Sequence, residues 1–218
     1  MGAFLPMRIA ILSLCLSGLM LAGCSSRDTN GMADLRGLLQ GDAPSERFVA
    51  LFDEQAPAVE LLFLRTQSVS RLLLSHENAG VLTWMSIEGA TLRTRNGFIV
   101  GTNGFFEGLQ AARIDAVARL VLAERTGQAE RLHTYLDGNN DISIHSYRCD
   151  IRPTANEMVA IKGQTTPTRR IEERCVNQTD DFTNIYWVSN GAILQAIQWI
   201  GPVAGALRTR QVDIYEGE

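Results

Sequence analysis

The stretch VLTWMSIEGATLRTRNGFIVGT, residues 81–102, contains the pattern that decides the fold class. Apolar and polar residues alternate through 81–87, pause at Glu88-Gly89, and alternate again on both sides of Asn96-Gly97. A period of two is typical of a strand with one buried face. Asn-Gly between such runs is a strong hairpin signal, because both turn residues must adopt positive φ. The stretch therefore predicts a three-stranded antiparallel meander.

Similar runs continue on both sides of this meander, and a second Asn-Gly pair occurs at 190–191. Two segments instead have helical spacing: residues 44–57, where Ser45 is placed to cap a helix, and residues 115–127, where Gly127 is placed to close one. About ten short strands with few helices indicate a mostly β protein. We predict a single-domain antiparallel β-barrel-like or double-sheet fold with one or two short helices.

The first residues resemble a bacterial lipoprotein signal peptide. Arg8 precedes an apolar stretch, residues 9–21, which is shorter than the roughly 20 residues of a membrane-spanning helix. Leu-Ala-Gly-Cys at 21–24 resembles a lipobox. The resemblance implies that the Cys24 thiol receives a diacylglyceryl group, that the peptide is cut before Cys24, and that the new amino terminus is acylated. The alternative is a plain secretory peptide cut near Ala22.

These features predict three segments and a compartment. Residues 1–23 are the removed signal peptide, residues 24–33 are a polar lipidated tether, and residues 34–218 form the single mostly β domain. Serines, not aspartate, follow Cys24, so the resemblance favours the outer membrane, with the domain on its periplasmic face. The formal net charge is −4 and becomes −5 without Arg8. A mildly acidic chain is a poor binder of nucleic acid.

Two cysteines, Cys149 and Cys175, remain in the predicted domain. In an oxidising periplasm two such cysteines most simply form a disulfide. Buried free thiols are the alternative. We predict no metal site and no cofactor, because these cysteines and three histidines offer no ligand cluster. His133 and His145 flank a turn and should lie nearly opposite one another, most simply as two half-exposed strand residues.

Acidic side chains in turns offer an alternative, enzymatic interpretation. Two carboxylates about 5 to 9.5 Å apart could hydrolyse a glycosidic bond. Aspartate is, however, also favoured in turns for backbone reasons, so the hydrolase is the weaker interpretation. The candidates are Asp137, Asp141, Asp180 and Asp181.

Arginines and tryptophans supply candidate contacts to a polysaccharide or a partner protein. Arg-Thr-Arg occurs twice, and strand alternation places the two arginines of each copy on the same strand face. The simpler interpretation is that these arginines lie on a sheet face exposed to solvent and contact no ligand. Tryptophan rings can stack on sugars, although core packing is commoner for tryptophans in apolar strands. The candidates are Arg93, Arg95, Arg208, Arg210, Trp84 and Trp187, with Trp199 in a similar setting.

Two stretches carry a family resemblance: LTWMSIEGATLRTRNGFIVGTNGF, residues 82–105, and YWVSNGAILQAIQWIGP, residues 186–202. With the lipobox, they resemble the YjbF/GfcB family of outer-membrane lipoproteins, associated with group 4 capsule and exopolysaccharide production. The resemblance implies a mostly β, barrel-like domain without established catalytic residues. The resemblance leads us to expect a basic residue after the Asn-Gly turn, but this chain has Phe98 there. A function of that basic residue is therefore not inferred for this chain.

The sequence and the resemblance together predict an accessory function. We expect an outer-membrane-anchored periplasmic lipoprotein that is not an enzyme and that serves exopolysaccharide or capsule production or export. Its partners would be polysaccharide, polysaccharide-export proteins, or both. The alternatives are the glycan hydrolase described above and a lipid or lipoprotein carrier with an open apolar barrel mouth.

Overall fold

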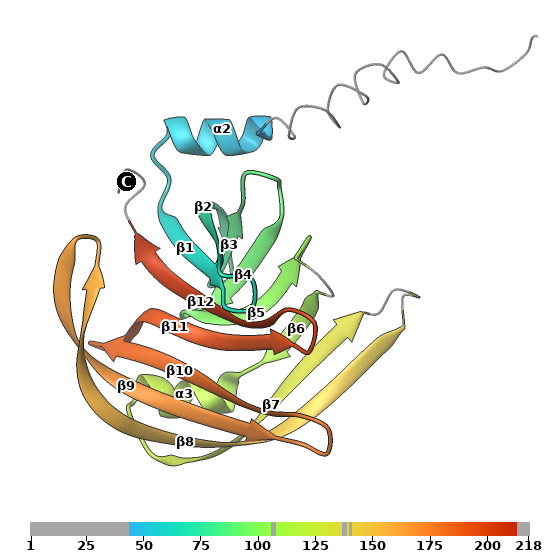
Figure 1. The fold of residues 1–218 in the computed structure, drawn as a ribbon, viewed down its shortest axis with the longest axis vertical. Helices are drawn as coiled ribbons and strands as arrows, with labels where there is room; N and C mark the ends of the chain where they lie inside the picture. The colour runs from blue at the N-terminus through green and yellow to red at the C-terminus, as the bar shows by residue number, and fades with distance from the viewer. Residues whose placement is uncertain (1–43, 106–107, 137–138, 140, 213–218) are drawn as a thin grey trace, which may run out of the picture. The chain divides into compact units, whose positions relative to one another are not determined.

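A computed structural model describes residues 44–105, 108–136, 139 and 141–212. The segments 1–23 and 24–33, Cys24 and Asp137 lie outside these residues. Within them, two short helices accompany one large antiparallel sheet (Figure 1), so the predicted fold class is confirmed. Neither described helix has the length and apolar character needed to cross a membrane.

The sheet contains twelve strands within the described residues, and most neighbours in space are neighbours in sequence. The order is β5-β4-β3-β2-β1-β12-β11-β10-β9-β8-β7-β6. The bounds are β1 Ala58–Phe63, β2 Ser68–Asn78, β3 Val81–Met85, β4 Thr91–Arg95, β5 Phe98–Asn103, β6 Leu109–Arg113, β7 Gly127–Leu136, β8 Ile142–Ile161, β9 Gln164–Val176, β10 Asp181–Ser189, β11 Ala192–Gly201 and β12 Gly205–Val212.

The sheet curls until its two outermost strands, β5 and β6, lie next to each other, which gives a nearly closed barrel. A side-chain contact joins them at this seam: the Leu109 N–H donates to the Thr102 hydroxyl at 3.0 Å. Two large apolar clusters of buried side chains fill the space between the strands. Barrel closure leaves few unpaired strand edges, which limits association through edges.

The meander of residues 81–102 forms as predicted, as β3, β4 and β5. Asn96 and Gly97 have φ of 51° and 83°, and Asn190 and Gly191 have φ of 51° and 72°. Both Asn-Gly pairs therefore make hairpin turns with two positive φ values. The pairs Ala79-Gly80 and Lys162-Gly163 make turns of the same kind, although neither contains the asparagine on which the sequence prediction relied.

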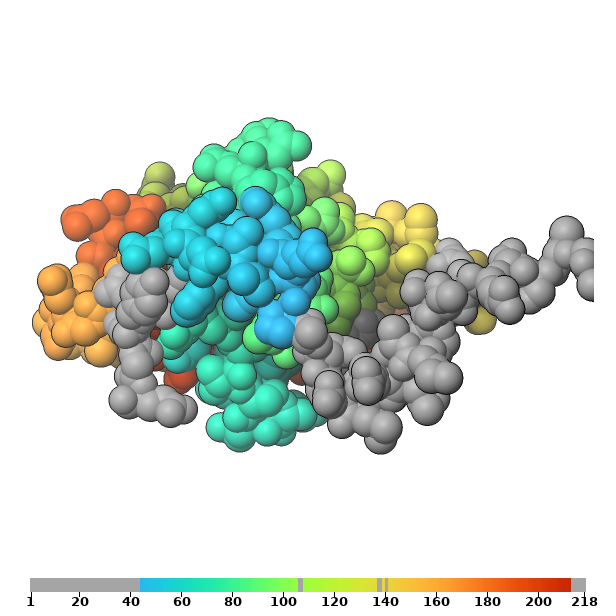
Figure 2. All heavy atoms as spheres, turned by 90° about the horizontal axis from the view of Figure 1, so that it is seen from above, coloured from blue at the N-terminus to red at the C-terminus, as the bar shows by residue number. Residues whose placement is uncertain are grey.

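Both predicted helices are present. Helix α2, Glu46–Asp53, begins after Ser45, whose hydroxyl accepts from the Phe48 N–H at 3.2 Å. It buries Leu51 against the outer face of β1, β2 and β12 at Ala58, Leu73 and Val212. Figure 2 shows α2 in blue at the centre of the face seen from above.

Helix α3, Asp115–Leu122, is shorter than predicted, and Gly127 does not close it. Glu124 takes the positive φ, 53°, after the helix, and the Arg125 N–H donates to the Leu120 carbonyl at 2.9 Å. Gly127 instead begins β7, where a Cβ atom would lie about 3.0 Å from Leu120 Cδ1. The glycine is thus used for the close approach of helix and strand, a role that the local sequence pattern does not distinguish from a helix cap.

The expectation of uniformly short strands is wrong for the hairpin of β8 and β9. Strand β8 has 20 residues, and its last part pairs with β9 alone. This arm, residues 152–168, curls beside the barrel (Figure 1). Val159 and Ile161 of the arm bury themselves against Trp187, on the outer face of β10. The long strand is stable because this second apolar contact supports it outside the barrel.

Gly97 is expected to be the glycine turn residue most sensitive to substitution. In Gly97→Ala the added Cβ would lie 2.7 Å from Ile193 Cβ, whereas at Gly191 no atom lies within 4 Å of the added Cβ. Both residues have positive φ, which costs an alanine about 1–2 kcal/mol. Chemical denaturation should show that Gly97→Ala lowers the free energy of unfolding by at least about 1 kcal/mol more than Gly191→Ala. Equal losses would contradict the close contact of the two turns.

Candidate functional site

A buried ion pair occupies the barrel interior between β7 and β9. Arg131 Nε and Nη2 donate to Glu173 Oε1 and Oε2 at 2.9 and 3.0 Å, a two-pronged contact. Tyr186 Oη and Asn184 Nδ2 also donate to Glu173 Oε2, at 2.6 and 2.8 Å. All four side chains are essentially inaccessible to water. Since each charge has several partners, the cost of burying it is offset.

The pKa values of this group reflect burial and mutual contact. Burial alone would lower the pKa of Arg131, but the Glu173 carboxylate and the Tyr186 hydroxyl outweigh it and raise that pKa. Burial raises the pKa of Tyr186 well above its usual value, although Arg131 acts in the opposite direction. The guanidinium is therefore charged and the phenol neutral at physiological pH.

His133 continues this polar network toward the surface. Its Nε2 lies 3.3 Å from Arg131 Nη1, and its Nδ1 lies 2.8 Å from Tyr135 Oη. A guanidinium can only donate, so Nε2 must accept and the proton must be on Nδ1, which donates to Tyr135. A further hydrogen bond joins Tyr135 to Tyr147, whose hydroxyl donates to Asp180 Oδ2 at 3.1 Å. In this chain of hydrogen bonds each group donates to the next one, from Arg131 in the interior to the Asp180 carboxylate.

The prediction that the two histidines lie opposite each other is confirmed, since His133 pairs with His145 across β7 and β8. The expectation that both are half-exposed is wrong for His133, which is fully buried between aromatic rings. It faces inward with Arg131 and Tyr135, as strand alternation requires. Burial, Arg131 and His145 hold the pKa of His133 well below its usual value.

The lowered pKa of His133 predicts a pH-dependent stability. In the unfolded chain the ring is protonated below about pH 6.5, whereas in the folded protein it stays neutral. Its contribution to stability is complete above about pH 6.5 and is lost as the pH falls, by up to about 1.4 kcal/mol per pH unit. Denaturation of His133→Gln at about pH 7.5 and pH 5.5 should show a smaller pH-dependent loss than the wild type. The matched exposed variant His76→Gln should keep the wild-type loss, and an unchanged slope in His133→Gln would contradict the assignment.

The predicted disulfide is confirmed. Cys149 and Cys175 are joined directly across β8 and β9, with their Cα atoms 4.0 Å apart. Among the described residues, one group could offer three metal ligands, Cys149, Glu173 and Cys175. Both sulfurs are in the disulfide, and Glu173 is held by Arg131, so this group has no ligand atoms to offer. The disulfide contributes about 3.5 kcal/mol by the chain-entropy estimate.

The acidic candidates for hydrolysis that the structure describes are held by partners. Asp180 Oδ2 accepts from Tyr147, Asn177 and Thr179 at 3.1 to 3.3 Å. Asp181 pairs with Arg174, with Oδ2 and Nη2 2.6 Å apart, and Arg174 lowers the pKa of Asp181. Asp141 lies near the start of β8. These contacts fit turn and strand stabilisation.

The four candidate arginines are divided between two places. Arg208 and Arg210 both donate to Glu60, at 3.1 and 3.0 Å, on the outer face of β1 and β12. Arg93 crosses Gly101 and donates to the Gln110 carbonyl at 2.5 Å, which ties β4 to β6 over the seam. Gly101 leaves the space that the guanidinium occupies. Arg95 is exposed at the end of β4.

The three tryptophans have three different environments. Trp187 is buried beneath the arm, and its Nε1 donates to Glu157 Oε2 at 2.6 Å. Trp199 stacks on Phe182, with ring centroids 4.4 Å apart. Trp84 donates from Nε1 to Thr94 Oγ1 at 2.8 Å and is only partly buried, because it lines an open pocket. Of the two tryptophans named as contacts, only Trp84 therefore borders a cavity.

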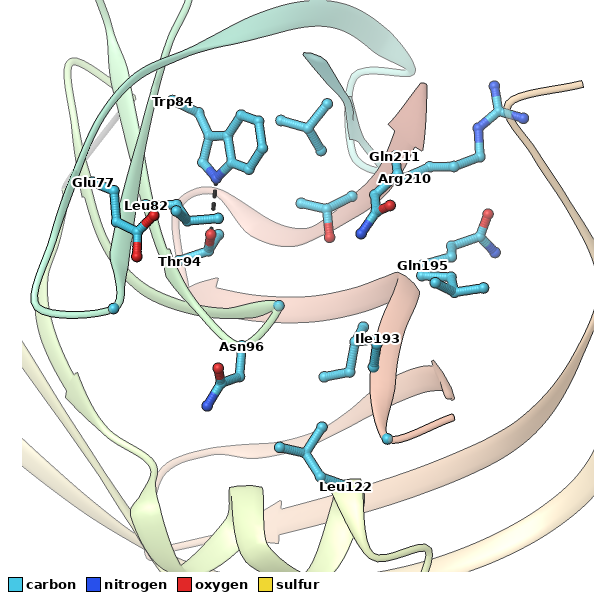
Figure 3. Close-up of a pocket in the computed structure, with 17 residues that line it drawn as sticks. Glu77, Leu82, Trp84, Thr94, Asn96, Leu122, Ile193, Gln195, Arg210 and Gln211 are labelled. Carbon is cyan, nitrogen blue, oxygen red and sulfur yellow. Dashed lines mark hydrogen bonds between the residues drawn. The ribbon is translucent and has the colours of Figure 1, made fainter. Parts of the chain in front are cut away.

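This pocket, which we call the mouth pocket, has a volume of about 560 Å³ and is the candidate functional site (Figure 3). It lies where the β2–β3, β4–β5 and β10–β11 turns and strand β12 meet. Its volume is within the range of roughly 300 to 1,000 Å³ that is typical of small-molecule sites. Side chains that line it are Val59, Glu77, Leu82, Trp84, Thr94, Asn96, Leu122, Ala192, Ile193, Leu194, Gln195, Thr209, Arg210 and Gln211.

Sequence reasoning found Trp84 and Arg210 of this pocket but missed its polar side chains, above all Asn96, Gln211 and Glu77. The sequence pattern identifies Asn96 only as a turn residue. Gln211 pairs with Val59, and Glu77 pairs with Leu82, so both project from the same sheet face as apolar lining residues. A polar residue at an inward position near a strand end is the signal that could have identified them.

The sequence profile described as "Group 4 capsule polysaccharide lipoprotein gfcB, YjbF" matches residues 51–212. The fold is similar to the crystal structure of the hypothetical lipoprotein YmcC from Escherichia coli (K12), with a TM-score of 0.65 and 17% sequence identity. The similarity covers 75% of this chain and 91% of that chain. No curated protein matches the sequence.

Proposed function

Because the chain belongs to the YjbF family of group 4 capsule polysaccharide lipoproteins, we propose that it is a non-enzymatic accessory of capsule or exopolysaccharide production. In this proposal, a lipid on Cys24 anchors it to the periplasmic face of the outer membrane. The barrel binds polysaccharide in the mouth pocket and presents it to export proteins.

The mouth pocket carries this proposal. Trp84 supplies an aromatic surface beside Leu82, and Val59 is a further apolar residue of the pocket lining. Sugar rings have apolar faces that pack on such surfaces, while their hydroxyl groups need hydrogen-bond partners. Thr94, Asn96 and Gln211 place hydroxyl and amide groups around the same space. An aromatic wall beside neutral polar groups is the combination that a saccharide requires.

The contacts of the acidic side chains support a non-enzymatic role. Glycoside hydrolysis uses one carboxylic acid to protonate the leaving group and a second carboxylate as base or nucleophile. Asp180 and Asp181 are occupied by hydroxyl, amide and guanidinium donors. In the mouth pocket, Glu77 is the single carboxylate among the lining residues that the structure describes. The pocket therefore has the groups for binding but lacks the pair for hydrolysis.

Complementation of a gene deletion tests this proposal. Cells without the gene should make surface polysaccharide of altered amount or chain length, and the wild-type gene should restore both. Trp84→Ala should fail to restore them at equal protein level. Since Trp84→Ala also removes core contacts, Asn96→Gly provides a second variant that keeps the positive φ of the turn.

Asn190→Gly is the matched control, because Asn190 has the same φ of 51° in an equivalent turn but does not line the mouth pocket. It should restore wild-type polysaccharide. Unchanged polysaccharide after deletion would contradict the function. Full restoration by both Trp84→Ala and Asn96→Gly would contradict the role of the pocket. Lipid that co-purifies with the unacylated protein and is displaced from the pocket would instead favour a lipid carrier.

A further inference from the structure

The mouth pocket contains few charged groups, although bacterial polysaccharides include acidic ones. Of the 17 residues that the structure describes in its lining, only Glu77 and Arg210 are ionisable. Their positions relative to the sheet decide which charge a bound sugar would encounter.

Arg210 belongs to the outer face of the barrel. Strand alternation places Arg210 on the face opposite to Thr209 and Gln211. Its cross-strand partners are Glu60 and Gln195, and its Nη2 donates to Glu60 Oε2 at 3.0 Å. In Figure 3 its guanidinium points away from Trp84. The positive charge is thus held by a carboxylate outside the sugar-sized space.

Glu77 lies on the same face of the sheet as the apolar lining residue Leu82, at the open rim of the pocket. It pairs with Leu82 across the β2–β3 hairpin, and in Figure 3 its carboxylate lies on the same side of the pocket as Trp84 and Thr94. The side chain is exposed at the rim. A bound uronate would therefore meet a like charge there, and among the pocket-lining residues that the structure describes no cation projects from the inner face to compensate.

The remaining inner groups are neutral and can each serve a sugar hydroxyl. The Asn96 and Gln211 amides both donate and accept hydrogen bonds, and the Thr209 hydroxyl does the same. Thr94 already accepts from Trp84, which fixes the indole at the pocket wall.

From this distribution we infer that the mouth pocket selects uncharged sugar residues of a polysaccharide and rejects uronate-bearing ones. This inference rests on the proposed function, since it names the class of sugar that the same pocket holds. The arginine pair Arg208 and Arg210 then serves the outer face of the sheet, where Glu60 engages both residues, and does not read acidic sugars inside the pocket.

The test is a binding array of gluco-, galacto- and manno-oligosaccharides, each uncharged or with uronate residues. It uses the full lipidated protein in detergent micelles. Uncharged oligosaccharides should bind, with less than about a twofold change between low salt and about 0.5 M NaCl, because no charge pair is involved. Asn96→Gly should weaken this binding and Asn190→Gly should not.

The second measurement neutralises the carboxylate at the rim of the pocket and compares the binding of charged and uncharged sugars. Glu77→Gln should raise the ratio of uronate-bearing to uncharged oligosaccharide binding by about fivefold, because it removes the like charge. Glu88→Gln is the matched control, since Glu88 is exposed at the β3–β4 turn, at the opposite end of these strands.

The outcomes separate this inference from the proposed function. Binding confined to uronate-bearing oligosaccharides, and lost in Asn96→Gly, would overturn the charge selection while supporting glycan binding in the pocket. Stronger binding of uronates without any effect of Glu77→Gln would also overturn the selection. No binding to any member of the array would count against both.

Discussion

Glu173→Ala is expected to lower the free energy of unfolding by about 3–5 kcal/mol, because it leaves the Arg131 charge buried without its carboxylate. Arg131 and Glu173 have side-chain exposures of 1% and 0%, so water cannot replace the lost partner. Tyr186 and Asn184 would lose their acceptor at the same time. Chemical denaturation of the wild type and variant, with the disulfide intact, measures the difference.

Glu172→Ala is the matched control for this experiment. Glu172 is the preceding residue of β9 and pairs with Arg152 and Arg170 at 3.0 and 2.6 Å, but on the outer face, where water reaches it. Such a pair contributes roughly 0–1 kcal/mol. The double variant Arg131→Met, Glu173→Leu should recover much of the loss, since it removes both charges. Equal losses for Glu172→Ala and Glu173→Ala would contradict the buried ion pair.

The second large effect is expected at the proposed anchor. Cys24→Ala should remove the protein from the outer-membrane fraction, because no thiol remains to receive a diacylglyceryl group. Each buried methylene contributes about 0.8 kcal/mol, and a single chain gives only marginal binding, so attachment depends on the complete set of acyl chains. Separation of inner and outer membranes on a density gradient, followed by immunoblotting, measures the distribution.

Cys15→Ala is the matched control for the anchor, since Cys15 lies in the segment predicted to be removed. It should leave the protein in the outer-membrane fraction, and the mature amino terminus should carry the lipid on Cys24. An outer-membrane fraction that is unchanged in Cys24→Ala would mean that attachment does not depend on this cysteine. A wild-type protein found in the inner membrane would contradict the proposed location instead.

Much of the fold could be predicted from local signals. Alternation and the pairs Asn96-Gly97 and Asn190-Gly191 act over a few residues, so the sequence displays them directly. The length of β8 could not be predicted in this way. Its final part is stabilised by Val159 and Ile161 against Trp187, a contact between segments that are distant along the chain. Such contacts override local propensity.

The candidate site was harder to predict than the fold for the same reason. Trp84 was identified by residue type, but the same reasoning applied equally to Trp187, which the arm buries. Arg93 was considered for a partner contact, yet its partner is the Gln110 carbonyl across the seam. Which strand faces lie inside the barrel, and which turns meet at its mouth, depend on how the sheet closes.

The interior of the barrel has two parts with different properties. Around Glu173, charged and aromatic side chains fill the space and satisfy one another. Around Trp84, the space remains open, and polar residues such as Thr94, Asn96 and Gln211 line it. This division is the reason for assigning binding to the mouth pocket and stability to the buried ion pair.

Binding of the cell's own surface polysaccharide to the purified lipidated protein is the measurement that tests the proposed function most directly. Isothermal titration should show saturable binding by the wild type and by Asn190→Gly. A central tryptophan contact typically contributes about 2 kcal/mol or more, so Trp84→Ala should weaken binding by about thirtyfold or more. Undiminished binding by folded Trp84→Ala, or no binding by the wild type, would contradict a polysaccharide site in the mouth pocket.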